Sequence, residues 1–152
     1  MSALDAYDLK ILGLLQENAR LTFTEIGRRV HLTSPAIAER VRRLERSGVI
    51  TGYSARVDLR ALGYSFEAFI QLTVKSDAVL DAWAAKHPEV LAQHAITGDD
   101  CAILRVGIAS PEHLQSLLKS LAEIGKTRTS IVLSSKLEDK PRKPASRLSA
   151  SK

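Results

Sequence analysis

The sequence is poor in the features that mark secreted or membrane proteins. One cysteine in 152 residues cannot form an intramolecular disulfide, and a single thiol suits a reducing compartment. No apolar run approaches the roughly 20 residues of a membrane-spanning helix, and because of the acidic side chains at Asp5 and Asp8 we expect no signal peptide at the N-terminus. These absences predict a soluble, cytoplasmic protein with no membrane partner.

Residues suited to metal binding or catalysis are scarce as well. The four histidines show no metal-ligand spacing with one another or with Cys101. A lone cysteine at the start of an apolar strand is usually a small buried side chain, and no cluster of catalytic His and Arg residues is evident. We therefore expect no metal, no cofactor, no catalytic residues and no enzymatic activity.

Charge is present but unevenly distributed. Residues 1–57 hold nine Lys or Arg against six Asp or Glu, a net charge of +3; residues 58–138 hold eight against ten, a net −2. Residues 139–152 hold five against one, a net +4. Because Lys and Arg supply the sequence-independent part of DNA affinity, this distribution predicts a DNA-binding first domain, a separate second domain and a basic tail.

The first domain contains two helix-length segments separated by a short turn. Thr22 and Glu25 form a Thr-x-x-Glu capping box at the first helix start. A second start follows the turn, with Thr33 or Ser34 as N-cap and Pro35 in the first turn. One face of this second helix is predicted to be buried, since apolar residues recur there at spacings of four and three: Ile37, Val41 and Leu44. The arrangement is that of a helix-turn-helix.

The opposite face of the second helix is polar and suits a DNA interface. The N-terminal part of a recognition helix enters the major groove, so the candidates for base contacts are Ser34, Pro35, Ala38 and Glu39. The candidates for phosphate contacts are Arg42, Arg43 and Arg46, whose alternative role is a solvated helix face. Arg40 lies beside the apolar stripe and is either structural or a further contact. The N-cap residues Thr22 and Thr33 complete the candidate DNA-binding set.

Period-two and helical patterns organise the rest of the chain. A helix from about Asp5 to Asn18 precedes the motif, and residues 49–57 read as a wing or hinge strand. The second domain is predicted to be a ferredoxin-like sheet with its helices on one side. Its strands are expected at residues 65–75, 90–97, 101–108 and 128–137, and its helices at 77–87 and from 110, in the order strand, helix, strand, strand, helix, strand. The uncovered sheet face, which includes Phe69, predicts a dimer.

Two sets of motifs resemble the leucine-responsive and asparagine-regulator (Lrp/AsnC) transcription factors. The first is Leu4-Asp5-x-x-Asp8-x-x-Ile11-Leu12 with the run Arg40–Tyr53; the second is Thr97-Gly98-Asp99 with the run Thr127–Leu133. The resemblance implies an α+β fold, with a winged helix-turn-helix domain followed by a ferredoxin-like (βαββαβ) effector and oligomerisation domain. It also implies double-stranded DNA as a partner, an amino acid as effector, and a homodimer or higher even-numbered assembly. The expected divisions are residues 1–50, 51–63 (hinge strand and linker), 64–138 and 139–152.

The sequence departs from the family at two places. His31 stands where the turn usually has glycine, which predicts a strained residue with positive φ. Amino-acid-responsive members have Gly-Asp-aromatic-Asp where this chain has Gly98-Asp99-Asp100-Cys101, so either Asp99 or Asp100 supplies the charge for an effector's ammonium, or the loop binds no ligand. Thr127 and Thr129 are the candidates for an effector's carboxylate, or are ordinary strand residues.

The sequence as a whole predicts a DNA-binding transcriptional regulator that responds to a small-molecule effector. The alternatives are a ligand-independent architectural DNA-binding protein of the same fold and an enzyme similar to the sirohaem decarboxylases, which would not need the arginine-rich recognition face. The composition of the tail, residues 139–152, predicts disorder. The tail then adds nonspecific DNA attraction or is inert.

Overall fold

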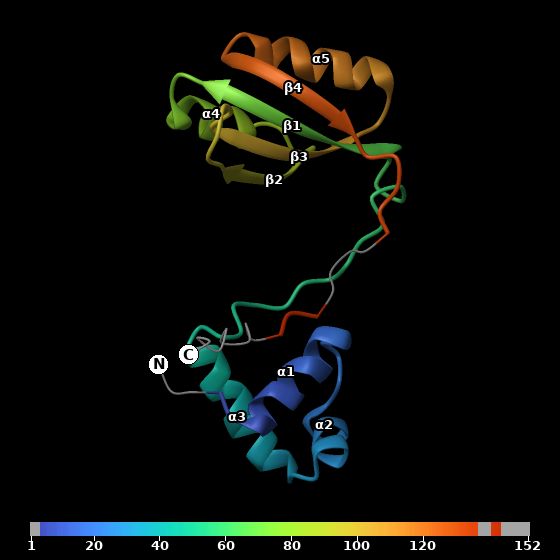
Figure 1. The fold of residues 1–152 in the computed structure, drawn as a ribbon. Helices are drawn as coiled ribbons and strands as arrows, with labels where there is room; N and C mark the ends of the chain where they lie inside the picture. The colour runs from blue at the N-terminus through green and yellow to red at the C-terminus, as the bar shows by residue number, and fades with distance from the viewer. Residues whose placement is uncertain (1–3, 137–140, 144–152) are drawn as a thin grey trace, which may run out of the picture. The chain divides into compact units, whose positions relative to one another are not determined.

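The computed structural model describes residues 4–136 and 141–143, which form two compact units (Figure 1). Residues 4–55 with 141–143 form the N-terminal unit, and Arg56–Lys136 form the C-terminal unit. The predicted tail is described only at residues 141–143, where the main chain of Arg142 donates to Gln16 Oε1 (2.6 Å) and accepts from Gln16 Nε2 (3.0 Å). The remaining tail residues lie outside the described chain.

Three helices build the N-terminal unit: α1 (Ala6–Glu17), α2 (Phe23–Val30) and α3 (Ser34–Arg46). The predicted Thr22–Glu25 capping box opens α2, and Thr33 caps α3 ahead of Pro35. A second capping box, between Asp5 and Asp8, opens α1. One apolar residue or stripe from each helix meets in a common core: Ile11, Ile26, Val30, Ile37, Val41 and Leu44.

The turn between α2 and α3 is tight at two residues, His31 and Gly27. His31 has φ 59° and ψ 45°, the left-handed conformation that was predicted for it. A Cβ at Gly27 would lie 2.4 Å from the carbonyl oxygen of Leu32, which is closer than a Cβ approaches any nonbonded heavy atom in real proteins. Glycine at this position therefore allows the turn to fold back against α2.

The predicted wing or hinge strand at residues 49–57 is wrong, since no strand is present there. Val49 and Ile50 instead donate their N–H groups to the Leu44 carbonyl oxygen at 2.9 and 3.1 Å, and they pack on the helical core. The following residues, 51–57, are exposed. A strand needs a neighbour for its backbone groups, and no described segment of this chain pairs with residues 49–57.

The C-terminal unit has the predicted ferredoxin-like order of elements. These are β1 (Phe66–Val74), α4 (Asp77–Ala84), β2 (Val90–Ala95), β3 (Ala102–Ile108), α5 (Pro111–Ala122) and β4 (Gly125–Ile131). The strands form one antiparallel sheet in the order β2-β3-β1-β4. The last strand was predicted at 128–137 but starts earlier and ends at Ile131. Gly125 pairs there with Val74 of β1, and a side chain at this position would not fit, because a Cβ would lie 2.6 Å from the Thr73 carbonyl oxygen.

Both helices of this unit cover the same face of the sheet (Figure 1). Alternate residues of β1 and β3 pack there against Leu80 of α4 and Leu117 and Leu121 of α5. The other face carries the remaining β1 positions, including Phe69, whose side chain is 40% exposed. Within the described chain, no helix covers this second face, here called the open face, as the sequence predicted.

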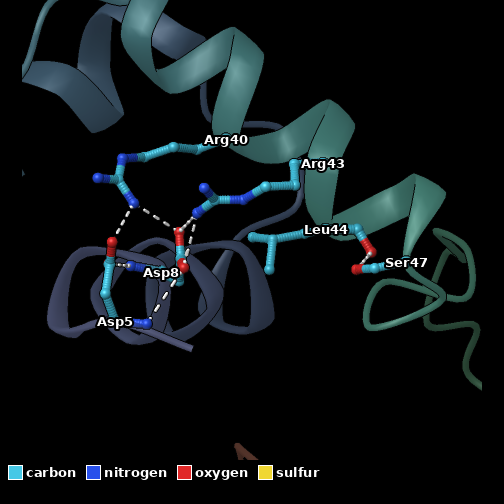
Figure 2. Close-up of polar contacts among 6 residues, drawn as sticks. All are labelled: Asp5, Asp8, Arg40, Arg43, Leu44 and Ser47. Atoms are coloured by element: carbon cyan, nitrogen blue, oxygen red, sulfur yellow. Dashed lines mark hydrogen bonds and ion pairs between the residues drawn. The ribbon is translucent and has the colours of Figure 1, made fainter. Parts of the chain in front are cut away.

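An ion-pair cluster fixes α3 against α1 (Figure 2). Asp8 is the one charged residue of the described chain that is buried, with 3% of its side chain exposed. Arg43 Nη2 lies 2.8 Å from both of its carboxylate oxygens, and Arg40 Nη1 lies 2.8 Å from Oδ1 and 2.6 Å from Asp5 Oδ2. The Arg40 guanidinium also lies over the Tyr7 ring, 5.4 Å from its centroid. This cluster sets the angle at which α3 presents its outer face.

Hydrogen bonding to Arg40 is the largest cause that lowers the pKa of Asp5 below its ordinary value, and the backbone N–H of Asp8 adds to it. The pKa of Arg40 is correspondingly raised by Asp5 and then by Asp8. Both shifts favour the ionised pair. Asp5 and Asp8 therefore act twice, as the capping box of α1 and as the anchor of α3.

We predict that Asp8→Asn lowers the free energy of unfolding of the N-terminal unit by about 1–3 kcal/mol, because the three contacts from Arg40 and Arg43 lose their charged acceptor at a buried position. Arg43→Ala should cost about 1 kcal/mol, since Arg40 still holds Asp8. Arg42→Ala, the matched control at an exposed site, should stay within about 0.5 kcal/mol. Urea unfolding followed by far-UV circular dichroism measures these changes. The fluorescence of Trp83, the only tryptophan, reports the C-terminal unit and should not move. Equal stability of the Arg42 and Arg43 variants would contradict the assigned anchor.

Candidate nucleic-acid interface

The first turns of α3 present small side chains at the surface. Pro35 is exposed, and Ser34 and Ala38 are partly exposed. Thr33 caps the helix, accepting from the Ala36 N–H at 3.4 Å. Such a helix start carries no bulky group, so a DNA base edge can approach it closely.

The four arginines of α3 fall into two sets. Arg40 and Arg43 point toward α1 and hold Asp8, with 24% and 49% of their side chains exposed. Arg42 and Arg46 point outward and are 64% and 66% exposed. Of the three arginines predicted to contact phosphate, two are therefore available on the outer surface. The third, Arg43, has a structural partner that the sequence analysis did not identify.

The two outward arginines share one acidic neighbour. Arg46 Nη2 lies 3.0 Å from Glu39 Oε1, and Arg42 Nη1 lies 4.0 Å from Glu39 Oε2. Glu39 is itself 63% exposed. Three predicted contact residues are thus brought together in one solvent-exposed ion-pair group, here called the Glu39 group: Glu39, Arg42 and Arg46.

Helix α2 adds residues that the sequence analysis missed. Arg28 and Arg29 occupy its last turn and are exposed. The first helix of a helix-turn-helix crosses the DNA backbone, so basic residues on its outer side were a readable signal. Thr22 is engaged in its capping box, where its Oγ1 lies 2.7 Å from Glu25 Oε2. Hydrogen bonds from the Thr22 side chain and backbone lower the pKa of Glu25.

The predicted effector loop lies between β2 and β3. Gly98 has φ 122°, a conformation that favours glycine. Asp100 is largely buried: its Oδ2 lies 3.3 Å from Arg128 Nη2, and its Oδ1 lies 3.2 Å from Thr73 Oγ1. The acid that replaces the family's aromatic residue is thus already paired within the chain.

Cys101 is partly buried and packs as a small side chain. Its thiol lies 3.3 Å from the Val74 N–H and 3.4 Å from the Leu72 carbonyl oxygen, and it packs on the sheet core. The thiol can both accept from the Val74 N–H and donate to the Leu72 carbonyl oxygen, whereas a carboxylate at this position could only accept and would also face the carbonyl oxygens of Leu72 and Val74. The sulfur therefore suits this position better than the family's acid would.

The six predicted effector residues do not converge on one side of the sheet. Thr127 and Thr129 pair with Leu72 and Ile70, so they lie on the helix-covered face. Arg128, with Asp100 beside it, lies on the open face.

Among the described residues no group of three or more His, Cys, Asp and Glu could hold a metal ion. Within the same residues, no helix is long and apolar enough to cross a membrane.

Comparison with known proteins agrees with this two-unit organisation. Residues 4–45 match the AsnC-type helix-turn-helix domain, and residues 67–141 match the Lrp/AsnC ligand binding domain. The uncharacterized HTH-type transcriptional regulator YezC of Bacillus subtilis is 43% identical over 132 residues, which cover 87% of this chain and 95% of YezC.

Solved structures show the same likeness. The feast or famine regulatory protein of Mycobacterium tuberculosis, complexed with L-methionine, has a TM-score of 0.84 at 31% identity, covering 92% of this chain and 99% of that one. The transcriptional regulator NMB0573 of Neisseria meningitidis, also complexed with L-methionine, has a TM-score of 0.83 at 30% identity, covering 93% and 97%. The chain belongs to the Lrp/AsnC family of transcriptional regulators.

Proposed function

We propose that this regulator binds double-stranded DNA sequence-specifically, with α3 in the major groove. The observation that carries the proposal is the outer face of α3. Small side chains occupy its first turns, and Arg42 and Arg46 project into solvent further along. Since a recognition helix reads bases through its N-terminal residues, the base contacts are assigned to Ser34, Pro35, Ala38 and Glu39.

Phosphate contacts are assigned to Arg42 and Arg46, with Arg28 and Arg29 of α2 on the flanking backbone. The N-cap residues Thr22 and Thr33 are further candidates, because helix starts favour phosphate oxygens. Arg43 is not assigned a phosphate contact, because its guanidinium holds Asp8. A regulator of chromosomal DNA acts where the genome is, so we place it in the cytoplasm. We propose no catalytic activity, in keeping with relatives named as transcriptional regulators.

We predict that Arg42→Ala and Arg46→Ala each flatten the dependence of DNA affinity on salt by about 0.9 log units per log unit of salt, the value of one phosphate contact. Arg60→Ala removes the same charge from the C-terminal unit and should leave the slope unchanged. Fluorescence anisotropy with a labelled duplex over a salt series measures all three. Slopes that do not differ from wild type would refute the phosphate assignment.

We further propose that the open face of the sheet joins two copies of the chain. A single helix-turn-helix reads few base pairs, and dimers of such proteins place two recognition helices about one helical turn apart on DNA. The open face carries the exposed Phe69 in the unit that does not bind DNA, so pairing there leaves both α3 helices free.

Sedimentation equilibrium should accordingly show a species of at least twice 16.6 kDa at micromolar concentration. Phe69→Asp should shift it toward the monomer, because a carboxylate buried without a partner disfavours association. Val79→Asp is the control, at an equally apolar position of α4 with 48% exposure. A wild-type chain that sediments only as a monomer would exclude this dimer.

We also propose that an amino acid binds at the loop that contains Gly98 and Asp99. Two structural neighbours are complexed with L-methionine, and Asp99 retains the family's first acid. Asp100, paired with Arg128, is the less available of the two carboxylates. Thr127 and Thr129 are retained as candidates for the effector's carboxylate, in which case a second copy supplies the missing half of the site.

A thermal-shift screen of the twenty amino acids should find at least one that raises the melting temperature, because a ligand that binds only the folded state stabilises it. Asp99→Ala should abolish the shift, whereas Asp100→Asn should only reduce it. Basal DNA affinity should be unchanged in both, as the loop lies in the other unit. No shift with any amino acid would favour a ligand-independent architectural DNA-binding protein of the same fold.

A further inference from the structure

Glu39 lies among the residues assigned to DNA, yet its charge opposes DNA. Phosphates repel a carboxylate, and the carboxylate here lies between the two arginines that would contact them. Its Oε1 lies 3.0 Å from Arg46 and its Oε2 lies 4.0 Å from Arg42. Each oxygen thus faces one of the two outward cations of α3.

The Glu39 group is exposed enough to rearrange. All three side chains are between 63% and 66% exposed, and an exposed ion pair is worth at most about 1 kcal/mol. A phosphate can therefore displace the carboxylate from an arginine. The displaced carboxylate then stands at the DNA surface without a partner, unless the DNA offers one.

The major groove offers such a partner only at certain bases. The amino group of cytosine donates a hydrogen bond to Glu or Asp side chains, whereas phosphates and carbonyl oxygens do not. Glu39 is the sixth residue of α3, within the half of a recognition helix that approaches base edges. At a matching base the carboxylate exchanges its arginines for the amino group.

We propose that Glu39 is a specificity-determining residue that weakens binding to DNA lacking a matching base. In the free protein Glu39 pairs with Arg42 and Arg46. On DNA the phosphates displace it from both arginines, and only a base amino group, as in cytosine, then gives the carboxylate a new partner. Specificity is a difference of affinities and is often raised by penalising the wrong partner. The inference rests on the proposed function, because it requires α3 to lie in the major groove.

The test begins with random-sequence duplex DNA, for which no operator needs to be known. Glu39→Gln removes the charge and frees both arginines, so it should bind random duplex about two- to fivefold more tightly, the range that one exposed ion pair is worth. Its salt dependence should also be steeper by up to about one unit.

Two further variants separate the pairing from net charge. Glu45→Gln makes the same charge change in the same helix, but Glu45 accepts from the Tyr53 hydroxyl at 2.9 Å rather than pairing with Arg42 or Arg46. Glu45→Gln should therefore tighten binding to random duplex less than Glu39→Gln does. Glu39→Asp keeps the charge and withdraws the carboxylate from Arg46, so its affinity for random duplex should lie between those of wild type and Glu39→Gln. Equal effects of Glu39→Gln and Glu45→Gln, or Glu39→Asp identical to wild type, would overturn the inference.

Selection of bound sequences from a random pool provides the second measurement. Wild type should enrich a motif with a cytosine that Glu39→Gln no longer requires, and the ratio of specific to random affinity should fall in the variant. Retention of both the cytosine and the ratio would overturn the inference alone. A wild-type chain that neither binds random duplex nor enriches any motif would instead overturn the proposed function.

Discussion

The buried carboxylate of Asp8 is the constraint on which the DNA-facing surface depends. An ionised group with 3% exposure is unfavourable unless it is paired, and its partners come from α3, more than 30 residues away. Successive residues of a helix are about 100° apart, so a helix that turns Arg40 and Arg43 toward α1 turns Arg42 away from it. Arg46 lies opposite the buried stripe of α3 and is 66% exposed. Together with the buried stripe of α3, one acid in α1 thereby separates the two arginines that hold the fold from the two that face solvent.

Features set by neighbouring residues, and the order of elements that follows from them, were predictable from the sequence, whereas individual side-chain contacts between distant residues were not. The spacing of Ile37, Val41 and Leu44 predicted the buried face of α3, because helical period and burial are local properties. The pairing of Arg43 with Asp8 was missed, since charge patterns do not show which side chains meet. Residues 49–57 have strand-like composition, but β propensity describes a surface that fits a sheet and supplies no neighbouring strand.

In the loop between β2 and β3, the sequence motif identifies the residues but not the side chains and backbone groups that contact them. The sequence placed Asp99, Asp100 and Cys101 together but could not show that Asp100 is engaged by Arg128 and Cys101 by the backbone of β1. Strand register adds a second limit. Adjacent residues of a strand point to opposite faces, so Thr127 and Thr129 lie on the helix-covered face and Arg128 on the open one.

Self-association increases the discrimination between DNA sequences that one α3 provides. Free energies at independent sites add, so each penalty that Glu39 imposes on a wrong base counts once per α3. If two copies bind through the open sheet face, a discrimination of about two- to fivefold per subunit becomes about four- to 25-fold per dimer. A weak, exposed ion-pair group is then sufficient for useful specificity, because a dimer joined through the sheet carries two α3 helices and the free-energy contributions of their two Glu39 groups add. An effector that altered pairing at the sheet would change DNA selectivity without touching α3.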